Sequence, residues 1–145
     1  MSKYKILIVE DEGNIFDMIT EELGETEYEF VRARNVSQAK GAYKYKSPFD
    51  CYVVDLQINS LGLEEHEMAD FSIFQGYAWL KNYVFNSMTQ EEIWNFKEKT
   101  IICSKYVPQF KDRFSEEEIA GFKIVHKEFD FEKKVKNFVS QICKK

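Results

Sequence analysis

Short apolar stretches rich in β-branched residues constrain the fold of this chain more than any other feature. The clearest is Lys5-Ile6-Leu7-Ile8-Val9, which is followed by charged residues, and similar stretches occupy 51–54, 100–103 and 122–125, with a weaker one at 28–31. Stretches of this length and composition are typical of strands that are buried on both faces of a parallel sheet. Five strands are therefore predicted.

Helical periodicity fills the segments between these stretches. Apolar residues recur at helical spacing in three stripes: Ile15, Met18, Ile19 and Leu23; Tyr77, Leu80, Val84 and Met88; and Phe131, Val135, Phe138 and Ile142. Ser37 is the expected N-cap of a further helix over 38–45, and capping-box patterns predict short helices that begin at Gln90 and Glu116. Each apolar stripe requires a sheet to cover.

Strand and helix alternate along the whole chain. This order predicts right-handed crossovers and a doubly wound α/β domain, with a five-stranded parallel sheet and helices on both faces. No Gly/Ser-rich or Pro-rich linker and no internal repeat divides the sequence, so residues 1–145 are expected to form a single domain. Ligands of such folds lie at the carboxyl ends of the strands, which directs attention to the residues that follow each stretch.

Charge and cysteine usage disfavour several function classes. Lys and Arg number 20 against 25 Asp and Glu, a net charge of −5, which argues against a general nucleic-acid-binding surface. No apolar run approaches the ~18 residues of a membrane span and the first residues lack a leader pattern, so the expected compartment is the cytoplasm. Cys51, Cys103 and Cys143 are widely spaced beside apolar residues, which indicates buried or half-buried thiols rather than a disulfide framework or a zinc site.

Charged and hydroxyl side chains follow four of the five predicted strands. Glu10 and Asp11 come after the first, Asp55 after the third, Ser104 after the fourth and Lys127 after the fifth. In a parallel sheet these positions converge, and carboxylates held together repel one another unless a divalent cation, most often Mg²⁺, joins them. A carboxylate can then attack phosphorus while a lysine and a hydroxyl stabilise the phosphoryl oxygens. The pattern predicts a phosphoryl-transfer site.

Three segments carry a resemblance to a known family. Residues 6–12 (Ile-Leu-Ile-Val-Glu-Asp-Glu), 50–56 (Asp-Cys-Tyr-Val-Val-Asp-Leu) and 126–130 (His-Lys-Glu-Phe-Asp) resemble the receiver domain of two-component response regulators, and the resemblance covers nearly the whole chain. It implies a flavodoxin-like strand order, 2-1-3-4-5. It also implies these roles: Asp55 as the phosphoacceptor and a metal ligand, Glu10 and Asp11 as the acidic pair with Asp11 the direct Mg²⁺ ligand, Gln57 as a ligand through its backbone carbonyl, Ser104 as the switch hydroxyl, and Lys127 as the phosphate-pairing lysine.

The function that the resemblance implies is phosphorelay signalling in a two-component system. A histidine kinase or phosphotransfer protein would phosphorylate Asp55 with Mg²⁺ as cofactor, and output would pass by contact to a downstream protein. Direct binding of nucleic acid or membrane is not expected, and a homodimer is left open. The resemblance implies no enzymatic turnover beyond the domain's own phosphorylation and dephosphorylation. It also implies that Gln57 and Tyr106, which flank the phosphate site, tune hydrolysis of the acyl phosphate.

The chain departs from the receiver pattern at three positions near the predicted site. Glu128 stands where the family has a proline after the lysine, Lys105 where a small residue follows the hydroxyl, and Ile124 where many receivers have a switching aromatic residue. Together with the insertion described below, these departures suggest an alternative, a pseudo-receiver interaction module that signals without phosphorylation, although the retention of all five site residues counts against it. A Mg²⁺-dependent phosphohydrolase is disfavoured because Gln57 occupies the position where acid catalysis would need an aspartate.

A long insertion of about residues 58–75 separates the third predicted strand from Gly76, which resembles the family's glycine before its third helix. Its helical composition and acidic bias leave two interpretations open: a lid or partner-selecting surface beside the site, or a tolerated surface elaboration. His66 within it lacks metal-ligand spacing, so a solvated acidic helix face is expected there. Trp79 and Tyr83 lie off the nearby apolar stripe and either pack under the insertion or belong to an exposed patch.

Overall fold

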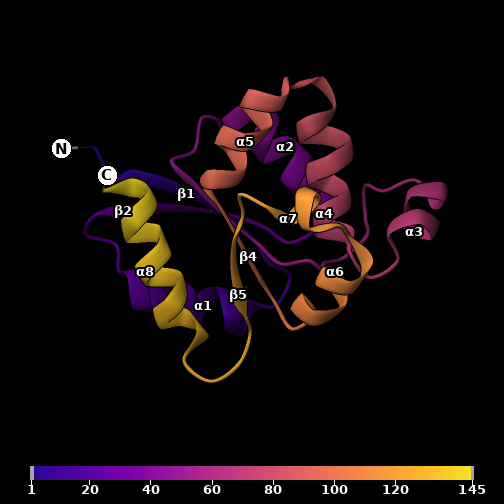
Figure 1. Cartoon of the computed structure of the whole chain (residues 1–145). Coiled ribbons are helices and arrows are strands. Elements are labelled where there is room, and N and C mark those ends of the chain that lie inside the picture. Colours follow the sequence, from indigo (N-terminus) through magenta and orange to yellow (C-terminus); the bar gives the residue numbers. More distant parts are fainter. Residues whose placement is uncertain (1, 145) are drawn as a thin grey trace.

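The computed structural model describes residues 2–144, which contain a five-stranded parallel sheet (Figure 1). The strands are β1 (Tyr4–Val9), β2 (Tyr28–Ala33), β3 (Cys51–Val54), β4 (Thr100–Ser104) and β5 (Lys123–His126). They lie in the order β2-β1-β3-β4-β5, and every neighbouring pair is parallel. The structure therefore confirms the doubly wound, flavodoxin-like sheet that the sequence predicts.

Helices cover both faces of the sheet. One face is covered by α1 (Gly13–Leu23) and α8 (Phe131–Cys143). The other is covered by α2 (Val36–Lys46), α4 (Gln75–Trp79), the π-helix η1 (Leu80–Val84), the 3₁₀-helix η2 (Phe85–Ser87), α5 (Gln90–Glu98), α6 (Val107–Arg113) and α7 (Glu116–Ile119). The insertion contains α3 (Glu65–Phe71), which projects from this layer beside α4 and α6 (Figure 1).

Side-chain alternation along the strands divides the core into two parts. On β1, Ile6 and Ile8 pack with α1 and α8, whereas Leu7 and Val9 pack in the opposite layer, and all four side chains are fully buried. Apolar side chains of the helices complete each part of the core, as Val135 of α8 does on the face covered by α1 and α8. Burial on both faces explains the mainly apolar sequences of the inner strands β3 and β4, whereas the edge strands β2 and β5 are only partly buried and include charged residues.

Two predicted helix starts are confirmed. α5 begins with a complete capping box, in which the Thr89 hydroxyl accepts a hydrogen bond from the Glu92 backbone at 3.2 Å and the Glu92 carboxylate accepts one from the Thr89 backbone at 2.9 Å. At the start of α7, the Ser115 hydroxyl accepts a hydrogen bond from the Glu118 backbone at 3.1 Å. Both contacts satisfy N–H groups that a helix leaves without internal partners.

The predicted N-cap of the second helix is wrong. α2 begins at Val36, and the cap is Asn35 rather than Ser37, because Oδ1 of Asn35 accepts a hydrogen bond from the Gln38 backbone at 2.8 Å. Val36 is fully buried, so the helix starts early enough to place that side chain in the core. The backbone N–H of Ser37 instead donates to the carbonyl of Leu61 at 2.7 Å, which ties α2 to the insertion.

The apolar stripe that follows the insertion does not form one continuous α-helix. The chain passes from α4 into the π turn of η1 and the 3₁₀ turn of η2, so Tyr77, Leu80 and Val84 are buried while Met88 lies beyond the helical segment. Trp79 is fully buried, so the exposed-patch interpretation is wrong for this residue. Tyr83 is half-buried, and its hydroxyl reaches α3 of the insertion.

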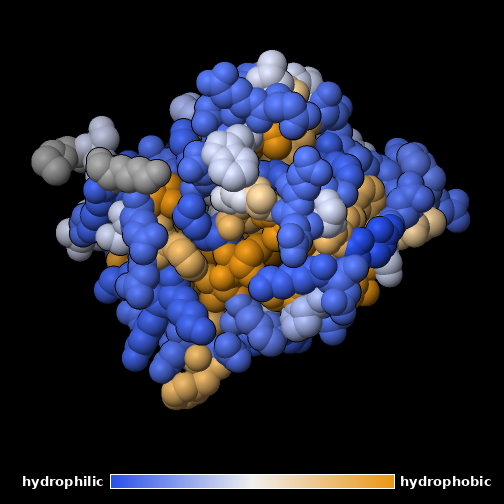
Figure 2. All heavy atoms as spheres, in the orientation of Figure 1, coloured by the Kyte–Doolittle hydropathy of each residue, from blue (hydrophilic) through white to orange (hydrophobic). Residues whose placement is uncertain are grey.

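The surface is mainly hydrophilic. Figure 2 shows apolar side chains in a hollow between α8 and the helices α5 and α7, where β5 forms one edge of the sheet. Within residues 2–144, no helix is both long and apolar enough to cross a membrane.

Candidate functional site

The predicted site residues meet at the carboxyl edge of the sheet. Glu10 and Asp11 follow β1, Asp55 follows β3, Ser104 ends β4 and Lys127 follows β5. Backbone hydrogen bonds continue the sheet ladder past the strand ends. The Asp55 N–H donates to the carbonyl of Val9, and the Lys127 N–H donates to the carbonyl of Ser104, each at 2.9 Å. This edge of the sheet therefore holds the backbones of the site in a fixed register.

Lys127 joins two of the carboxylates. Its Nζ lies 2.6 Å from Oε1 of Glu10 and 2.8 Å from Oδ2 of Asp55. All three side chains are at most 8% exposed, so water screens these ion pairs little. A buried charge without a partner is costly, and here each charge has one.

Backbone N–H groups occupy the other oxygens of the two buried carboxylates. Oε2 of Glu10 accepts a hydrogen bond from the Glu12 backbone at 3.2 Å, and Oδ1 of Asp55 accepts one from the Gln57 backbone at 3.3 Å. The Lys127 ammonium group on one oxygen and a backbone N–H on the other therefore fix the orientation of each carboxylate.

The crowding of charge perturbs the buried groups. Burial and the nearby Asp55 carboxylate raise the pKa of Glu10 above its ordinary value, against the opposing effect of Lys127. For Lys127, burial lowers the pKa, but the Asp55 and Glu10 carboxylates outweigh burial and raise it above its ordinary value. Lys127 is consequently a permanent positive charge at this edge of the sheet.

The donor set fits a hard divalent cation. Glu10, Asp11 and Asp55 each offer a carboxylate oxygen, and these oxygens lie within 4.8 Å of one another. Glu10 and Asp55 are buried whereas Asp11 is exposed, so the group opens to solvent at Asp11. Lys127 supplies only one positive charge to three carboxylates, and Mg²⁺ prefers oxygen ligands of this kind. Within residues 2–144, the acidic residues around His66 form no comparable group.

Ser104 is fully buried at the end of the neighbouring strand β4. Its Oγ accepts a hydrogen bond from the Tyr106 backbone at 3.1 Å. This contact uses a lone pair of the oxygen, so the O–H of Ser104 is still able to donate.

The residues that depart from the receiver pattern take up distinct positions. The Glu128 side chain is 57% exposed and lies 3.6 Å from Nζ of Lys134, while the preceding lysine still reaches both carboxylates. Lys105 is exposed, and its carbonyl lies 3.2 Å from Nε2 of His126. Ile124 is half-buried against the core of the α2 face.

Arg32 of β2 is a residue of the site that sequence reasoning missed. Its Nε donates to the carbonyl of Glu10 at 3.2 Å and its Nη2 to the carbonyl of Asp11 at 3.1 Å, while the guanidinium lies 5.1 Å from the ring centre of Phe16. Arg32 therefore holds the loop that carries the acidic pair. No local motif marks such a residue, because only the pairing of β2 with β1 brings it there.

Gly76 determines how closely α4 approaches the site. A Cβ at this position would lie 2.0 Å from the carbonyl oxygen of Asp55. The Gly76 N–H donates to the carbonyl of Leu56 at 2.8 Å, which keeps the helix start against the loop after β3. The absence of a side chain at 76 is therefore a requirement of the packing behind Asp55.

The insertion is attached to neighbouring helices through the buried carboxylate of Glu67. This carboxylate accepts hydrogen bonds from the Tyr83 hydroxyl at 2.6 Å, the Asn82 amide at 2.8 Å and the Glu64 backbone at 2.9 Å. Burial raises the pKa of Glu67, but these hydrogen bonds outweigh burial and lower it below its ordinary value. The insertion thus has a built anchor on η1.

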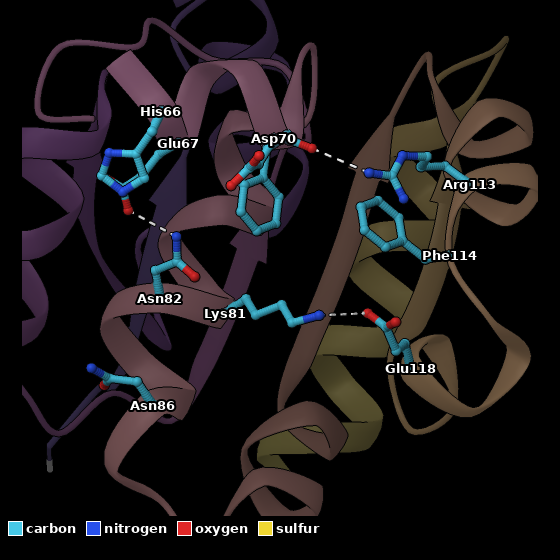
Figure 3. A pocket seen from close by; sticks show the side chains of 10 residues that line it. His66, Glu67, Asp70, Lys81, Asn82, Asn86, Arg113, Phe114 and Glu118 are labelled. Atoms are coloured by element: carbon cyan, nitrogen blue, oxygen red, sulfur yellow. Dashed lines mark hydrogen bonds and ion pairs between the residues drawn. The ribbon is translucent and has the colours of Figure 1, made fainter. Parts of the chain in front are cut away.

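A surface pocket of about 590 Å³ separates the insertion from α6 and α7 (Figure 3). A salt bridge of 3.1 Å between Lys81 and Glu118 crosses it, and Arg113 donates to the carbonyl of Asp70 at 3.2 Å. The residues that line it are His66, Glu67, Asp70, Phe71, Lys81, Asn82, Asn86, Arg113, Phe114 and Glu118. They include none of the predicted site residues, so the pocket is separate from the carboxylate cluster.

Comparisons with known proteins find similarity in structure. The sequence matches no known family profile and no curated protein. The receiver domain of the Francisella response regulator 1452 is similar with a TM-score of 0.67 at 17% identity, over 98% of each chain. Vibrio cholerae chemotaxis protein CheY4 has a TM-score of 0.65 at 17% identity, over 97% of this chain and 99% of that one. The Mn(2+)-bound form of response regulator Rcp1 has a TM-score of 0.65 at 17% identity, over 94% and 92%.

These similarities extend over nearly the whole of each chain. The protein has the fold of response regulator receiver domains, which confirms the fold that the sequence resemblance implied.

Proposed function

We propose that this chain is a phosphoacceptor receiver domain of a two-component phosphorelay, in which Asp55 takes a phosphoryl group from a histidine kinase or a phosphotransfer protein. The observation that carries the proposal is Lys127, whose ammonium group bridges Asp55 and Glu10 beside a third carboxylate, Asp11. A purely structural ion pair needs no third carboxylate next to it. A phosphoryl-transfer site needs both the lysine and a cluster that can hold a cation.

In the transfer, a carboxylate oxygen of Asp55 forms a bond to phosphorus as the bond from phosphorus to the donor's imidazole nitrogen breaks, and the electron pair of that bond returns to the nitrogen. Lys127 already lies 2.8 Å from Asp55, within reach of oxygens on a phosphoryl group bound there. The free O–H of Ser104, on the adjacent strand, would donate to another of these oxygens.

Mg²⁺, when bound, would supply positive charge that offsets the phosphoryl group, held by Glu10, Asp11, Asp55 and the Gln57 carbonyl. Similarity to the Mn(2+)-bound form of Rcp1 supports a divalent cation at this edge of the sheet. Gln57 and Tyr106 donate backbone hydrogen bonds to Asp55 and Ser104, so both residues flank the site, where their side chains would tune hydrolysis of the acyl phosphate.

Output would follow from the added negative charge. Lys127 divides its contacts between Glu10 and Asp55, and a phosphoryl group on Asp55 would draw the ammonium group away from Glu10. Ile124 offers no aromatic side chain to rotate, so the signal would reach a downstream protein through other contacts. The domain would turn over no substrate beyond its own acyl phosphate.

The insertion would serve as a partner-selecting surface rather than a lid. Its anchors on α2 and η1 support a fixed surface, since a lid must open. Glu67→Gln, which weakens the anchor, separates the two roles. A partner surface predicts an unchanged rate of phosphorylation by acetyl phosphate and an altered rate with a protein donor. A lid predicts that both rates change.

The deciding experiment is intact-protein mass spectrometry after incubation with acetyl phosphate and Mg²⁺. We expect one phosphoryl adduct on the wild type, none on Asp55→Asn and none without Mg²⁺. Asp70→Asn, which changes an exposed acid of the insertion, serves as the matched control and should be phosphorylated like the wild type.

The second candidate is a pseudo-receiver that signals without phosphorylation. It is favoured by the exposed Lys105 next to Ser104, where a small residue would give a phosphodonor access. No adduct on the wild type, together with no binding of Mg²⁺ or beryllofluoride, would overturn the phosphoacceptor proposal and favour this alternative.

A further inference from the structure

Two thiols meet at the amino edge of the sheet, opposite the site. Cys51 is the first residue of β3 and Cys143 is the last residue of α8. α8 follows β5 and runs back along the sheet for 13 residues, roughly 20 Å, which returns its end to the edge where the strands start. Both cysteines belong to the core beneath α1 and α8.

Contacts of Lys144 hold the end of α8 in this place. Its Nζ lies 2.9 Å from Oε2 of Glu27 and 5.8 Å from the ring centre of Tyr28, at the start of β2. In Figure 1 the C-terminal end of α8 accordingly lies beside the start of β2. An ion pair thus holds the end of α8 at the amino edge of the sheet in addition to its packing.

The two thiols differ in exposure and chemistry. Cys51 is fully buried, whereas Cys143 is half-buried, and each thiol perturbs the pKa of the other. The interaction with Cys51, assisted by the charge of Lys144, lowers the pKa of Cys143, while the interaction with Cys143 and burial raise the pKa of Cys51. Cys103, the remaining cysteine, is buried, and burial raises its pKa.

We propose that Cys143 and Cys51 form a peroxide-oxidisable pair, in which Cys143 is the attacking thiol and Cys51 the resolving thiol of a reversible intramolecular disulfide. Cys143 is the thiol that solvent can reach, and Cys51 is the buried thiol of the same core at the same edge of the sheet. The pair fits a redox-sensing disulfide rather than a structural one, because one of its two thiols is partly open to solvent and therefore to an oxidant.

The chemistry balances with hydrogen peroxide as the oxidant. The Cys143 thiolate attacks one peroxide oxygen, the O–O bond breaks, and the departing hydroxide takes a proton to leave as water, which gives a sulfenic acid at Cys143. The Cys51 sulfur then attacks the Cys143 sulfur, the S–O bond breaks, and a second water leaves with the Cys51 proton. A dithiol reductant reverses the cross-link by exchange.

The cross-link would fasten α8, which follows Lys127 in the sequence, to β3, which precedes Asp55. Asp55 lies four residues after Cys51, roughly 13 Å along an extended strand, so the sulfur chemistry is separate from the carboxylates. Phosphorylation competence is therefore not needed for the disulfide to form.

The test is hydrogen peroxide treatment of the full chain, followed by denaturation, alkylation with N-ethylmaleimide and intact-mass measurement. We expect the reduced protein to take up three labels and the oxidised protein one, with a peptide map that joins residues 51 and 143 and a dithiol that restores all three. A disulfide between two chains, a link that includes Cys103, or three labels after oxidation would each overturn the proposal.

Variants assign the roles. Cys51→Ala should leave a sulfenic acid at Cys143 that dimedone traps, and Cys143→Ala should leave Cys51 fully reduced. Cys103→Ala is the matched control, since it removes a buried thiol that is not part of the pair, and its cross-link should match the wild type. If Cys51→Ala fails to fold, Cys51→Val and the wild-type peptide map decide the assignment. Oxidation of Cys51 in Cys143→Ala would contradict the assigned order.

Discussion

Gly76→Ala tests how the helix start behind Asp55 is packed. In a helix, replacement of glycine by alanine normally stabilises by about 1 kcal/mol, because alanine has the higher helix propensity. At Gly76 the new Cβ would lie 2.0 Å from the carbonyl oxygen of Asp55 and 3.1 Å from its carbonyl carbon. Both atoms belong to backbone at the carboxyl edge of the sheet, so no side chain can rotate away.

The size of the effect follows from this distance. Real Cβ contacts essentially never fall below 3.0 Å, so the helix and the loop after β3 must separate by about 1 Å. Overpacking of this kind costs about 1–3 kcal/mol, and the rigid backbone partner places Gly76 at or above the upper end. With the propensity gain subtracted, we expect a net loss of about 2 kcal/mol in the free energy of unfolding.

Urea denaturation of the wild type and two variants measures this loss. Gly41→Ala is the matched control, because Gly41 lies inside α2 with no atom within 4 Å of the new Cβ, and it should stabilise by about 0.5–1 kcal/mol. The two substitutions are chemically identical and should have opposite signs. If Gly76→Ala proves as stable as the wild type while Gly41→Ala behaves as expected, the argument from close packing at Asp55 is refuted.

Three further predictions concern charged side chains. With metal removed by a chelator, Lys127→Met should lower the free energy of unfolding by about 3 kcal/mol, because it leaves two buried carboxylates unpaired. Lys81→Met is the control, because it breaks an exposed ion pair and should lower the free energy of unfolding by less than about 1 kcal/mol. The folded pKa of Glu67 lies below the ordinary 4.5, so the stabilisation from its carboxylate should be present above pH 4.5 and lost as the pH falls through the folded pKa. A Glu67→Gln variant should lack this part of the loss of stability in acid. Equal acid sensitivity of the wild type and the variant would contradict the prediction. Arg32→Gln should weaken Mn²⁺ binding measured by calorimetry several-fold, because the acidic loop loses two hydrogen bonds, and unchanged affinity would remove its positioning role.

Much of the fold could be predicted because its determinants are local. The apolar stretch Ile6–Val9 specifies a strand buried on both faces wherever it lies in the chain, and the capping box at Thr89 specifies a helix start. The cap of α2 was mispredicted for a tertiary reason. Ser37 and Asn35 are both good caps, and the burial of Val36 decides between them.

The site was predictable to a similar degree. A parallel sheet brings its carboxyl ends together, so the order of Glu10, Asp55 and Lys127 along the sequence was enough to expect their meeting. Arg32 was not predictable, because an arginine in an ordinary strand has no distinguishing pattern. The anchoring of the insertion through Glu67 was equally hidden, since its partners come from a helix that follows later in the chain.

By itself, the sequence determined which segments are strands and helices, that the strands are parallel, and which charged side chains share one edge of the sheet. These properties follow from periodicity and chain order. Only the tertiary structure decided which groups pair within that edge, how closely α4 approaches Asp55 over Gly76, and that Cys51 and Cys143 share one core at the opposite edge. The physical reason is that these contacts depend on ångström-scale packing between elements distant in the chain, which local preference does not specify.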